Sequence, residues 1–236
     1  MTSLVTVAHG SRRLLGNAVG WMIAARAGAR LAIPSTAAYV ESCAPSLDEA
    51  LADSAAGPTL VVPLLLSTGH HLRVDLPAAV AAAGGRVGRE IRLGGPLGPD
   101  PLLARAQAER LLEAGAVRGQ PIVMVAAGSR DRTAIGDLWT AAELLAQTWG
   151  GPVRVATLAG RGPGVADVVG PGDAVSTYLL APGFFSARGR DLALAAGADV
   201  VADVLGPHPE VVELVCRRAA ALQATNALGE SARRAG

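Results

Sequence analysis

The amino-acid sequence predicts an α/β protein made of two similar halves, each with a mostly parallel sheet. Short β-branched or apolar runs alternate along the chain with longer stretches of helical period, which is the pattern of βαβ units. The run Thr59–Leu66 is apolar nearly throughout, as expected for a strand buried on both faces of a parallel sheet. Short motifs of the first half then recur, in the same order, in the second half.

The first half contains four predicted strands and four predicted helices in alternation. The strands are Leu4–Ala8, Thr36–Val40, Thr59–Leu66 and Glu90–Leu93. The helices are Leu14–Ala29, a helix opening at Pro45, Leu72–Ala83 and Pro99–Ala114. The helix at Pro45 is indicated by a proline near its start and by acidic residues in its first turn, which suit the positive end of the helix dipole.

The same alternation restarts after a turn-rich stretch at Gly115–Gln120. The predicted strands are Ile122–Ala126, Val153–Leu158, Val175–Ala181 and Val200–Val204. The predicted helices are Arg132–Trp149, Leu192–Ala196 and an amphipathic closing helix, Glu210–Ala224. We therefore expect a first half of residues 1–117, a second half of residues 118–225 and a flexible tail of residues 226–236.

Three aligned motifs indicate that the halves arose by internal duplication. At an offset of 118 residues, Val7–Arg12 aligns with Val125–Arg130 and Ala38–Glu41 aligns with Ala156–Ala159. At an offset of 114, Leu65–Gly69 aligns with Leu179–Gly183. Three matches in order, at nearly the same offset, predict two copies of one unit.

Composition excludes several classes of protein. The 236-residue chain is 50% hydrophobic and 17% charged, and its net charge of +1 argues against binding nucleic acid by bulk charge. Cys43 and Cys216 lie far apart without a CxxC motif, so neither a disulfide framework nor a structural zinc site is expected. The N-terminus does not resemble a signal peptide, and no apolar run reaches the roughly 18 residues of a membrane span. We expect a cytoplasmic protein that binds neither membrane nor nucleic acid.

Three side chains of the first half follow predicted strands directly: His9, Glu41 and His71. Ligands of open parallel sheets bind outside the carboxyl ends of the strands, and a strand order of 2-1-3-4 would make these strands neighbours. Two imidazoles and a carboxylate then form a plausible site for a divalent first-row metal ion. Each residue also has a simpler interpretation, as a hydrogen-bonded loop histidine, a turn cap or a solvated helix start.

The second half lacks all three groups. Its residues equivalent to His9, Glu41 and His71 are Ala127, Ala159 and Phe185, while the surrounding Gly-Ser-Arg and glycine turns remain. This joint loss favours one half that carries the chemistry and one that preserves only the shape.

The sequence resembles the class II chelatases, specifically the sirohydrochlorin cobalto- and ferrochelatases of the CbiX type. Val7–Arg12 is similar to the first motif of that family. Val62–Pro77 is similar to the second motif, in which a histidine precedes x-x-x-Asp-Ile-Pro; this chain has His71 followed by Asp75, Leu76 and Pro77. The resemblance implies a flavodoxin-like fold in both halves, with the second half as a degenerate repeat. It implies that His9 and His71 bind the metal, that Glu41 is the family's carboxylate, and that His9, Glu41 and His71 form the catalytic set.

The implied reaction inserts a divalent metal ion, Fe²⁺ or Co²⁺ with Ni²⁺ also possible, into sirohydrochlorin for sirohaem or cobalamin biosynthesis. The metal is then a substrate, and no permanently bound cofactor is expected. Because the tetrapyrrole carries many carboxylates, we expect Ser11, Arg12 and Arg73 to bind it, with Arg13 nearby. Phe184 and Phe185 offer apolar surface to the macrocycle. Two alternatives stay open, a non-catalytic metal or tetrapyrrole carrier on the same fold and a regulatory pair of ligand-binding domains.

Overall fold

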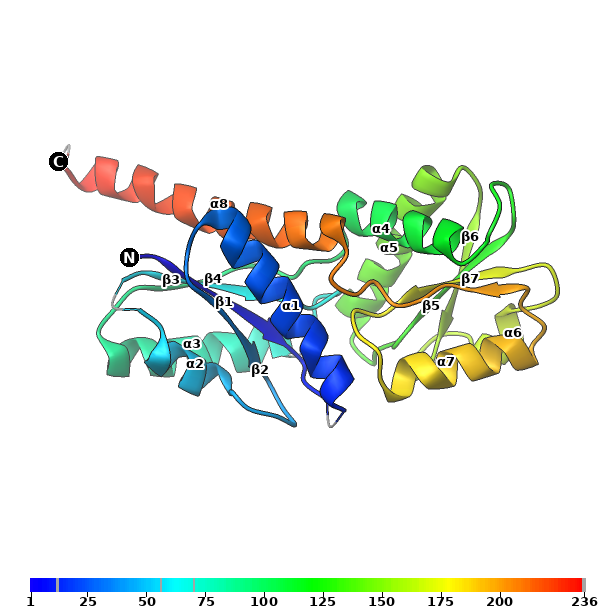
Figure 1. Ribbon diagram of the computed structural model, residues 1–236, viewed down its shortest axis with the longest axis horizontal. Coiled ribbons are helices and arrows are strands. Elements are labelled where there is room, and N and C mark those ends of the chain that lie inside the picture. Colours follow the sequence, from blue (N-terminus) through cyan, green and yellow to red (C-terminus); the bar gives the residue numbers. More distant parts are fainter. Residues whose placement is uncertain (12, 56, 70, 235–236) are drawn as a thin grey trace.

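The protein has two open parallel sheets side by side, each flanked by helices (Figure 1). The computed structural model describes residues 1–11, 13–55, 57–69 and 71–234, with only the backbone for residues 71, 87 and 225–234. The strand order is β2-β1-β3-β4 in the first sheet and β6-β5-β7-β8 in the second. The predicted fold class of two similar α/β halves is confirmed.

The first sheet consists of β1 (Ser3–Ala8), β2 (Ser35–Tyr39), β3 (Thr59–Pro63) and β4 (Ile91–Leu93). The helices of this part of the chain are α1 (Leu14–Leu31), α2 (Leu47–Asp53), α3 (Leu76–Val87) and α4 (Pro101–Glu113). A short π-helical turn, η1 (His71–Asp75), precedes α3. The predicted helix Leu72–Ala83 therefore starts as a π-helical turn and becomes an α-helix only at Leu76, where Pro77 occupies one of the first helical positions.

The second sheet consists of β5 (Ile122–Ala126), β6 (Val153–Thr157), β7 (Ala174–Tyr178) and β8 (Val200–Val201). Its part of the chain forms α5 (Arg132–Trp149), α6 (Val165–Val168), α7 (Phe184–Ala195) and α8 (Pro209–Arg234).

Two helix boundaries of the second half were predicted wrongly. Helix α7 begins at Phe184 rather than Leu192, because the Ser186 hydroxyl accepts a hydrogen bond of 2.8 Å from the Gly183 N–H at the start of the helix. Helix α8 continues to Arg234, beyond the predicted end at Ala224, in a stretch that contains no proline to end it. None of the helices among the described residues is both long enough and apolar enough to cross a membrane.

The two halves exchange helices. Helix α4 leaves the first sheet and packs against α5 and β7, where the Gln107 amide oxygen accepts a buried hydrogen bond of 2.9 Å from the Ser176 hydroxyl. Helix α8 returns from the second half and packs against α1 and β3, and it crosses the top of the molecule in Figure 1. One apolar cluster, which includes Leu4, Leu103, Met124 and Leu214, therefore extends through both halves. The exchange fixes the two sheets relative to each other.

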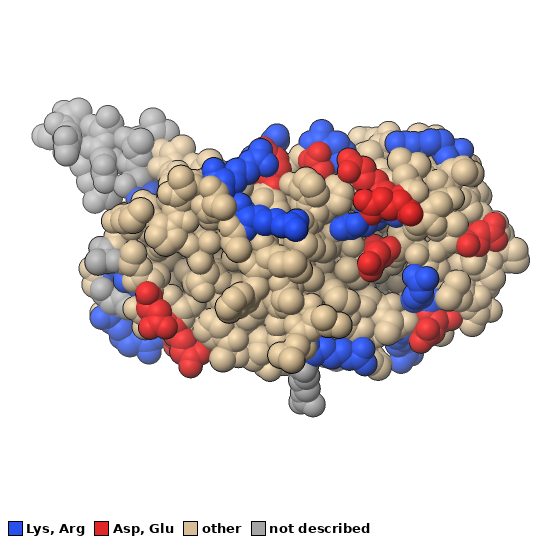
Figure 2. All heavy atoms as spheres, in the orientation of Figure 1, with Lys and Arg blue, Asp and Glu red and all other residues tan. Residues whose placement is uncertain are grey.

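Charged side chains of both signs lie interspersed along the α8 and α4 side of the molecule (Figure 2). Ion pairs there join α8 to α1 through Arg30 and Glu213, at 2.5 Å, and to α4 through Arg105 and Glu210, at 3.2 Å. These exposed pairs stabilise the exchange only modestly, since each is worth about 0–1 kcal/mol.

The internal duplication is visible in the backbone hydrogen bonds. In the first half, the Glu41 N–H donates to the His9 carbonyl at 3.0 Å, and in the second half the Ala159 N–H donates to the Ala127 carbonyl at 2.9 Å. The strand registers agree with both offsets. Val5 pairs with Val61 in the first sheet, and Val123 pairs with Val175 in the second; Val123 lies 118 residues after Val5, and Val175 lies 114 residues after Val61. The two predicted offsets therefore describe equivalent positions in space.

Gly10 and Gly128 hold the equivalent strand ends against their neighbours. Gly10 has φ of 95°, and a Cβ there would lie 1.9 Å from the Glu41 carbonyl oxygen. Gly128 has φ of 84°, and its Cβ would lie 1.9 Å from the Ala159 carbonyl oxygen. Only glycine permits both this backbone conformation and this approach.

Tyr39 ends β2 and fixes the start of α1, because its hydroxyl donates a hydrogen bond of 2.7 Å to the Asn17 carbonyl. Its side chain is buried, with 2% exposed. Burial, and secondarily the nearby Cys43 thiol, raise the pKa of Tyr39 to about 12.

We predict that Gly10→Ala and Gly128→Ala destabilise the protein by similar amounts. The positive φ alone should cost about 1–2 kcal/mol, and the contact with the carbonyl oxygen should add to it. Chemical denaturation gives the free energies of unfolding. The control is Gly150→Ala, at φ of 87° with no atom within 4 Å of its Cβ. An equal loss in all three variants would contradict the role of close approach.

We predict that Tyr39 contributes stability below about pH 10 that is lost as the pH rises through about 12. A raised pKa means that the folded state favours the neutral phenol, so the unfolded state loses its proton first. The chain contains no lysine to titrate in this range. Tyrosinate absorbance of the native protein should rise only near pH 12, against about pH 10 in denaturant. A native titration near pH 10 would show that the hydroxyl is not held as described.

Candidate functional site

A cleft between the halves lies where β1 and β5 end. It comprises two adjoining cavities of about 490 Å³ and 290 Å³. Both are lined by His9 and by its counterpart in the second half, Ala127. The carboxyl edges of two parallel sheets therefore meet at one cavity, which is where parallel α/β sheets bind ligands.

His9 follows β1 and lies at the junction of the two cavities. Its imidazole is exposed to the cleft, while its backbone carbonyl is held by the Glu41 N–H. Among the residues predicted to bind metal, His9 is the one whose described side chain lines the cleft.

Glu41 lies beside His9 through its backbone, and its side chain is exposed. It does not line either cavity of the cleft. The structure thus brings the Glu41 and His9 loops together without placing the carboxylate in the cavity wall. The φ of Ser42, 70°, turns the chain away directly after Glu41.

The second predicted metal ligand, His71, begins the π-helical turn η1. Its side chain and all of His70 lie outside the described residues, so pairing of His9 with His71 stays a prediction. Among described side chains, no group of three His, Cys, Asp or Glu residues is arranged to hold a metal ion. What the backbone shows is that the segment leading to η1 forms one wall of the smaller cavity, through Leu65, Ser67 and Gly69.

Ser11, a predicted substrate-binding residue, lines the larger cavity. Its backbone is held by the Asn17 side chain, whose Oδ1 accepts from the Ser11 N–H at 2.9 Å and whose Nδ2 donates to the Ser11 carbonyl at 2.8 Å. Sequence reasoning missed Asn17, which also lines this cavity; an asparagine inside a predicted helix gives no signal of this contact. The predicted substrate residue Arg12 lies outside the described residues.

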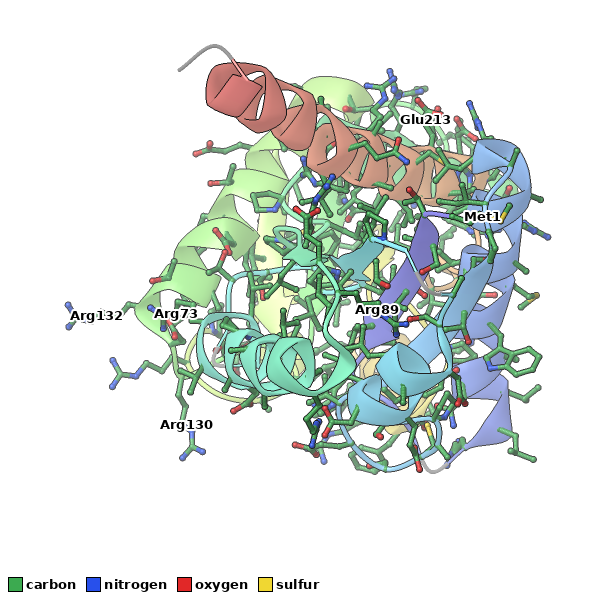
Figure 3. The ribbon with its side chains drawn as sticks, turned by 90° about the vertical axis from the view of Figure 1, so that its left-hand side faces the viewer. Met1, Arg73, Arg89, Arg130, Arg132 and Glu213 are labelled. Atoms are coloured by element: carbon green, nitrogen blue, oxygen red, sulfur yellow. The ribbon has the colours of Figure 1, made fainter. Side chains whose placement is uncertain are left out.

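Arg73 of η1 forms an ion pair with Asp131, which precedes α5 in the second half. Figure 3 shows Arg73 at the start of α5, with Arg130 and Arg132 extending outward beside it. Arg130 and Arg132 are exposed and were not predicted as site residues. The hydrogen bond from the Thr133 N–H, and secondarily the positive charge of Arg73, hold the pKa of Asp131 below its usual range.

Phe184 and Phe185 line the larger cavity on the side of the second half. Their side chains are 62% and 40% exposed, and their rings meet edge to face at 5.8 Å. Large aromatic side chains exposed at a cavity indicate contact with a ligand rather than with the core. The cleft therefore combines an imidazole with an apolar aromatic wall.

Comparison with known proteins agrees with this architecture. A sequence model of the CbiX family matches residues 3–114. No curated protein matches the chain.

Solved structures resemble the whole chain. SirB from Bacillus subtilis with Fe³⁺ has a TM-score of 0.79 and 24% identity, over 92% of this chain and 93% of that one. The SirB sirohydrochlorin chelatase from Bacillus subtilis subspecies spizizenii in complex with cobalt has a TM-score of 0.72 and 20% identity, over 92% and 93%. CbiX, described as the terminal enzyme of sirohaem biosynthesis in denitrifying bacteria, has a TM-score of 0.67 and 19% identity, over 94% and 99%. These similarities extend the fold to both halves. Residues 3–114 therefore match the CbiX family, and the chain as a whole has the fold of the CbiX and SirB structures.

Proposed function

We propose that the protein is a sirohydrochlorin chelatase, which inserts a divalent metal ion into the tetrapyrrole at one site per chain. The observation that carries this proposal is the composition of the cleft. Both halves line it, yet the first half contributes His9 where the second contributes Ala127. The match of residues 3–114 to the CbiX family and the folds of metal-bound SirB support the same function.

The reaction needs groups that hold a metal ion loosely and accept protons. Insertion forms bonds from M²⁺ to the macrocycle nitrogens and releases two pyrrole N–H protons. Neutral imidazole is a suitable ligand for first-row divalent metals and does not retain them as thiolates retain soft metals. In the proposed mechanism, His9 and His71 deliver the ion, and Glu41 or solvent takes up protons at the edge of the cleft.

The remaining residues of the site match a large, flat and acidic substrate. Phe184 and Phe185 provide apolar surface for the face of the macrocycle, and Ser11 provides a polar contact on the same cavity. Arg12, Arg73 and the newly located Arg130 and Arg132 are the proposed partners of its carboxylates, since guanidinium groups pair with carboxylates through two hydrogen bonds. The proposed metals are Fe²⁺ and Co²⁺, with Ni²⁺ as a third candidate.

The direct test is metal insertion into sirohydrochlorin, followed by its absorbance change, with Fe²⁺, Co²⁺ and Ni²⁺ side by side. A chelatase turns over many equivalents of tetrapyrrole. Binding without turnover would instead identify a carrier on the same fold and would overturn the proposal.

We predict that His9→Ala lowers the insertion rate by about a hundredfold or more, because the cleft loses the imidazole common to both of its cavities. The matched control is Ala127→Ser, a small change at the equivalent position, which should leave insertion within about twofold. Circular dichroism checks that both variants fold. Equal loss in both variants would mean that the two halves contribute the same chemistry.

A further inference from the structure

The cleft has two equivalent sides that differ in the contacts between their loop segment and the facing helix. On each side, a segment that begins at the end of the third strand of one half faces the first helix of the other half. We call residues 64–73 the histidine segment, since it carries His71, and residues 178–187 its counterpart. The histidine segment faces α5, and the counterpart faces α1, as the lining of the two cavities shows.

Two carboxylates hold the histidine segment to α5. The Asp137 Oδ2 atom accepts a hydrogen bond of 2.5 Å from the backbone N–H of Thr68. Asp131 forms an ion pair with Arg73 at the other end of the segment. Asp131 is itself fixed, because its Oδ1 atom accepts from the Thr133 N–H at 2.8 Å and caps α5. These two contacts span the part of the segment that contains His71.

At the four equivalent positions, the other side of the cleft has no residue that could make either contact. The offset of 118 makes Val19 the counterpart of Asp137 and Arg13 the counterpart of Asp131. The offset of 114 makes Pro182 the counterpart of Thr68 and Ala187 the counterpart of Arg73. Proline has no N–H to donate, and valine has no group to accept one. The cavity on this side is the larger, at about 490 Å³ against 290 Å³.

The need to hold the two halves together does not explain why only one side of the cleft has these two carboxylate contacts. The exchanged helices α4 and α8 already join the two sheets through one apolar core. The Tyr178 hydroxyl also donates to the Leu66 carbonyl at 3.1 Å, which attaches the start of the histidine segment to β7. The carboxylate contacts instead lie beyond Leu66, on the side that carries a histidine, whereas the side that carries Phe184 and Phe185 has neither carboxylate.

We propose that Asp137 and Asp131 are positioning residues for metal insertion: they hold the backbone of the histidine segment against α5, beside the cleft that His9 lines. The other side, with the larger cavity and the exposed phenylalanines, accepts the apolar face of the macrocycle. This inference rests on the proposed function. A segment held at both ends presents its ligand without first having to be ordered, which is how preorganisation raises affinity and rate.

The test is Asp137→Ala, which removes the acceptor of the Thr68 N–H, compared with Asp137→Asn, which keeps an amide oxygen there. We expect Asp137→Ala to lower insertion at saturating sirohydrochlorin by roughly ten- to a hundredfold, as for loss of a hydrogen bond to a charged group. The KM for metal should rise, and the KM for sirohydrochlorin should stay within about twofold because Asp137 contacts the Thr68 backbone and none of the side chains proposed to bind the macrocycle. Asp137→Asn should recover most of the rate.

Hydrogen exchange followed by mass spectrometry supplies a second readout. Exchange over residues 64–75 should increase in Asp137→Ala and stay unchanged elsewhere. The control is Glu143→Ala, an exposed acidic residue on the same helix, which should alter neither exchange nor rate. If Asp137→Ala keeps the wild-type insertion rate and the wild-type KM for metal, the positioning role of Asp137 is overturned while the proposed function stands. A uniform increase in exchange with a general loss of activity would identify a merely structural role. A wild-type chain that inserts no metal would overturn the proposed function and the positioning role together.

Discussion

The structure depends on the exchange of α4 and α8 between the halves, because this exchange brings the carboxyl edges of two separate sheets to one cleft. Each four-stranded sheet alone would present the carboxyl ends of its own strands to solvent, with no second sheet facing them. With α4 on the second sheet and α8 on the first, one apolar core passes through both halves and fixes their relation. The ends of β1 and β5, with His9 and Ala127, then face a common cavity. Apolar burial thus determines where the polar chemistry can occur.

Duplication followed by divergence explains the asymmetry of this cleft. The glycine turns, strand registers and backbone hydrogen bonds are equivalent in the two halves. The side chains at the cleft differ between the halves. His9 of the first half has Ala127 as its counterpart, and the side held by the Asp131 carboxylate has as its counterpart a side with the exposed rings of Phe184 and Phe185. A large planar substrate needs a wall on each side but only one place where the metal is delivered. Preserving the backbone of both halves while changing the side chains of one satisfies both needs.

Sequence reasoning predicted the strands, both offsets and the position of His9 at the cleft, because each rests on local signals. A continuous apolar run such as Thr59–Leu66 indicates a buried parallel strand, and a repeated Gly-Ser turn marks equivalent strand ends. It did not predict the helix exchange, since nothing in the periodicity of α4 or α8 specifies which sheet each covers. Nor did it find Asn17 or Asp137. A polar residue on the outer turns of a helix has the same pattern whether it faces solvent or a neighbouring loop. The carboxylate of Glu41 was expected in the site; its side chain is exposed and lines neither cavity, so its role stays a prediction.

The central claim is that two similar halves build a single metal-handling site at His9. The most direct measurement is the location and number of Co²⁺ ions bound by the chain, from anomalous X-ray scattering and metal content in solution. The account predicts one ion per chain in the cleft, about 2.1 Å from an imidazole nitrogen of His9. Two ions per chain, one in each half, or one ion remote from His9, would contradict it.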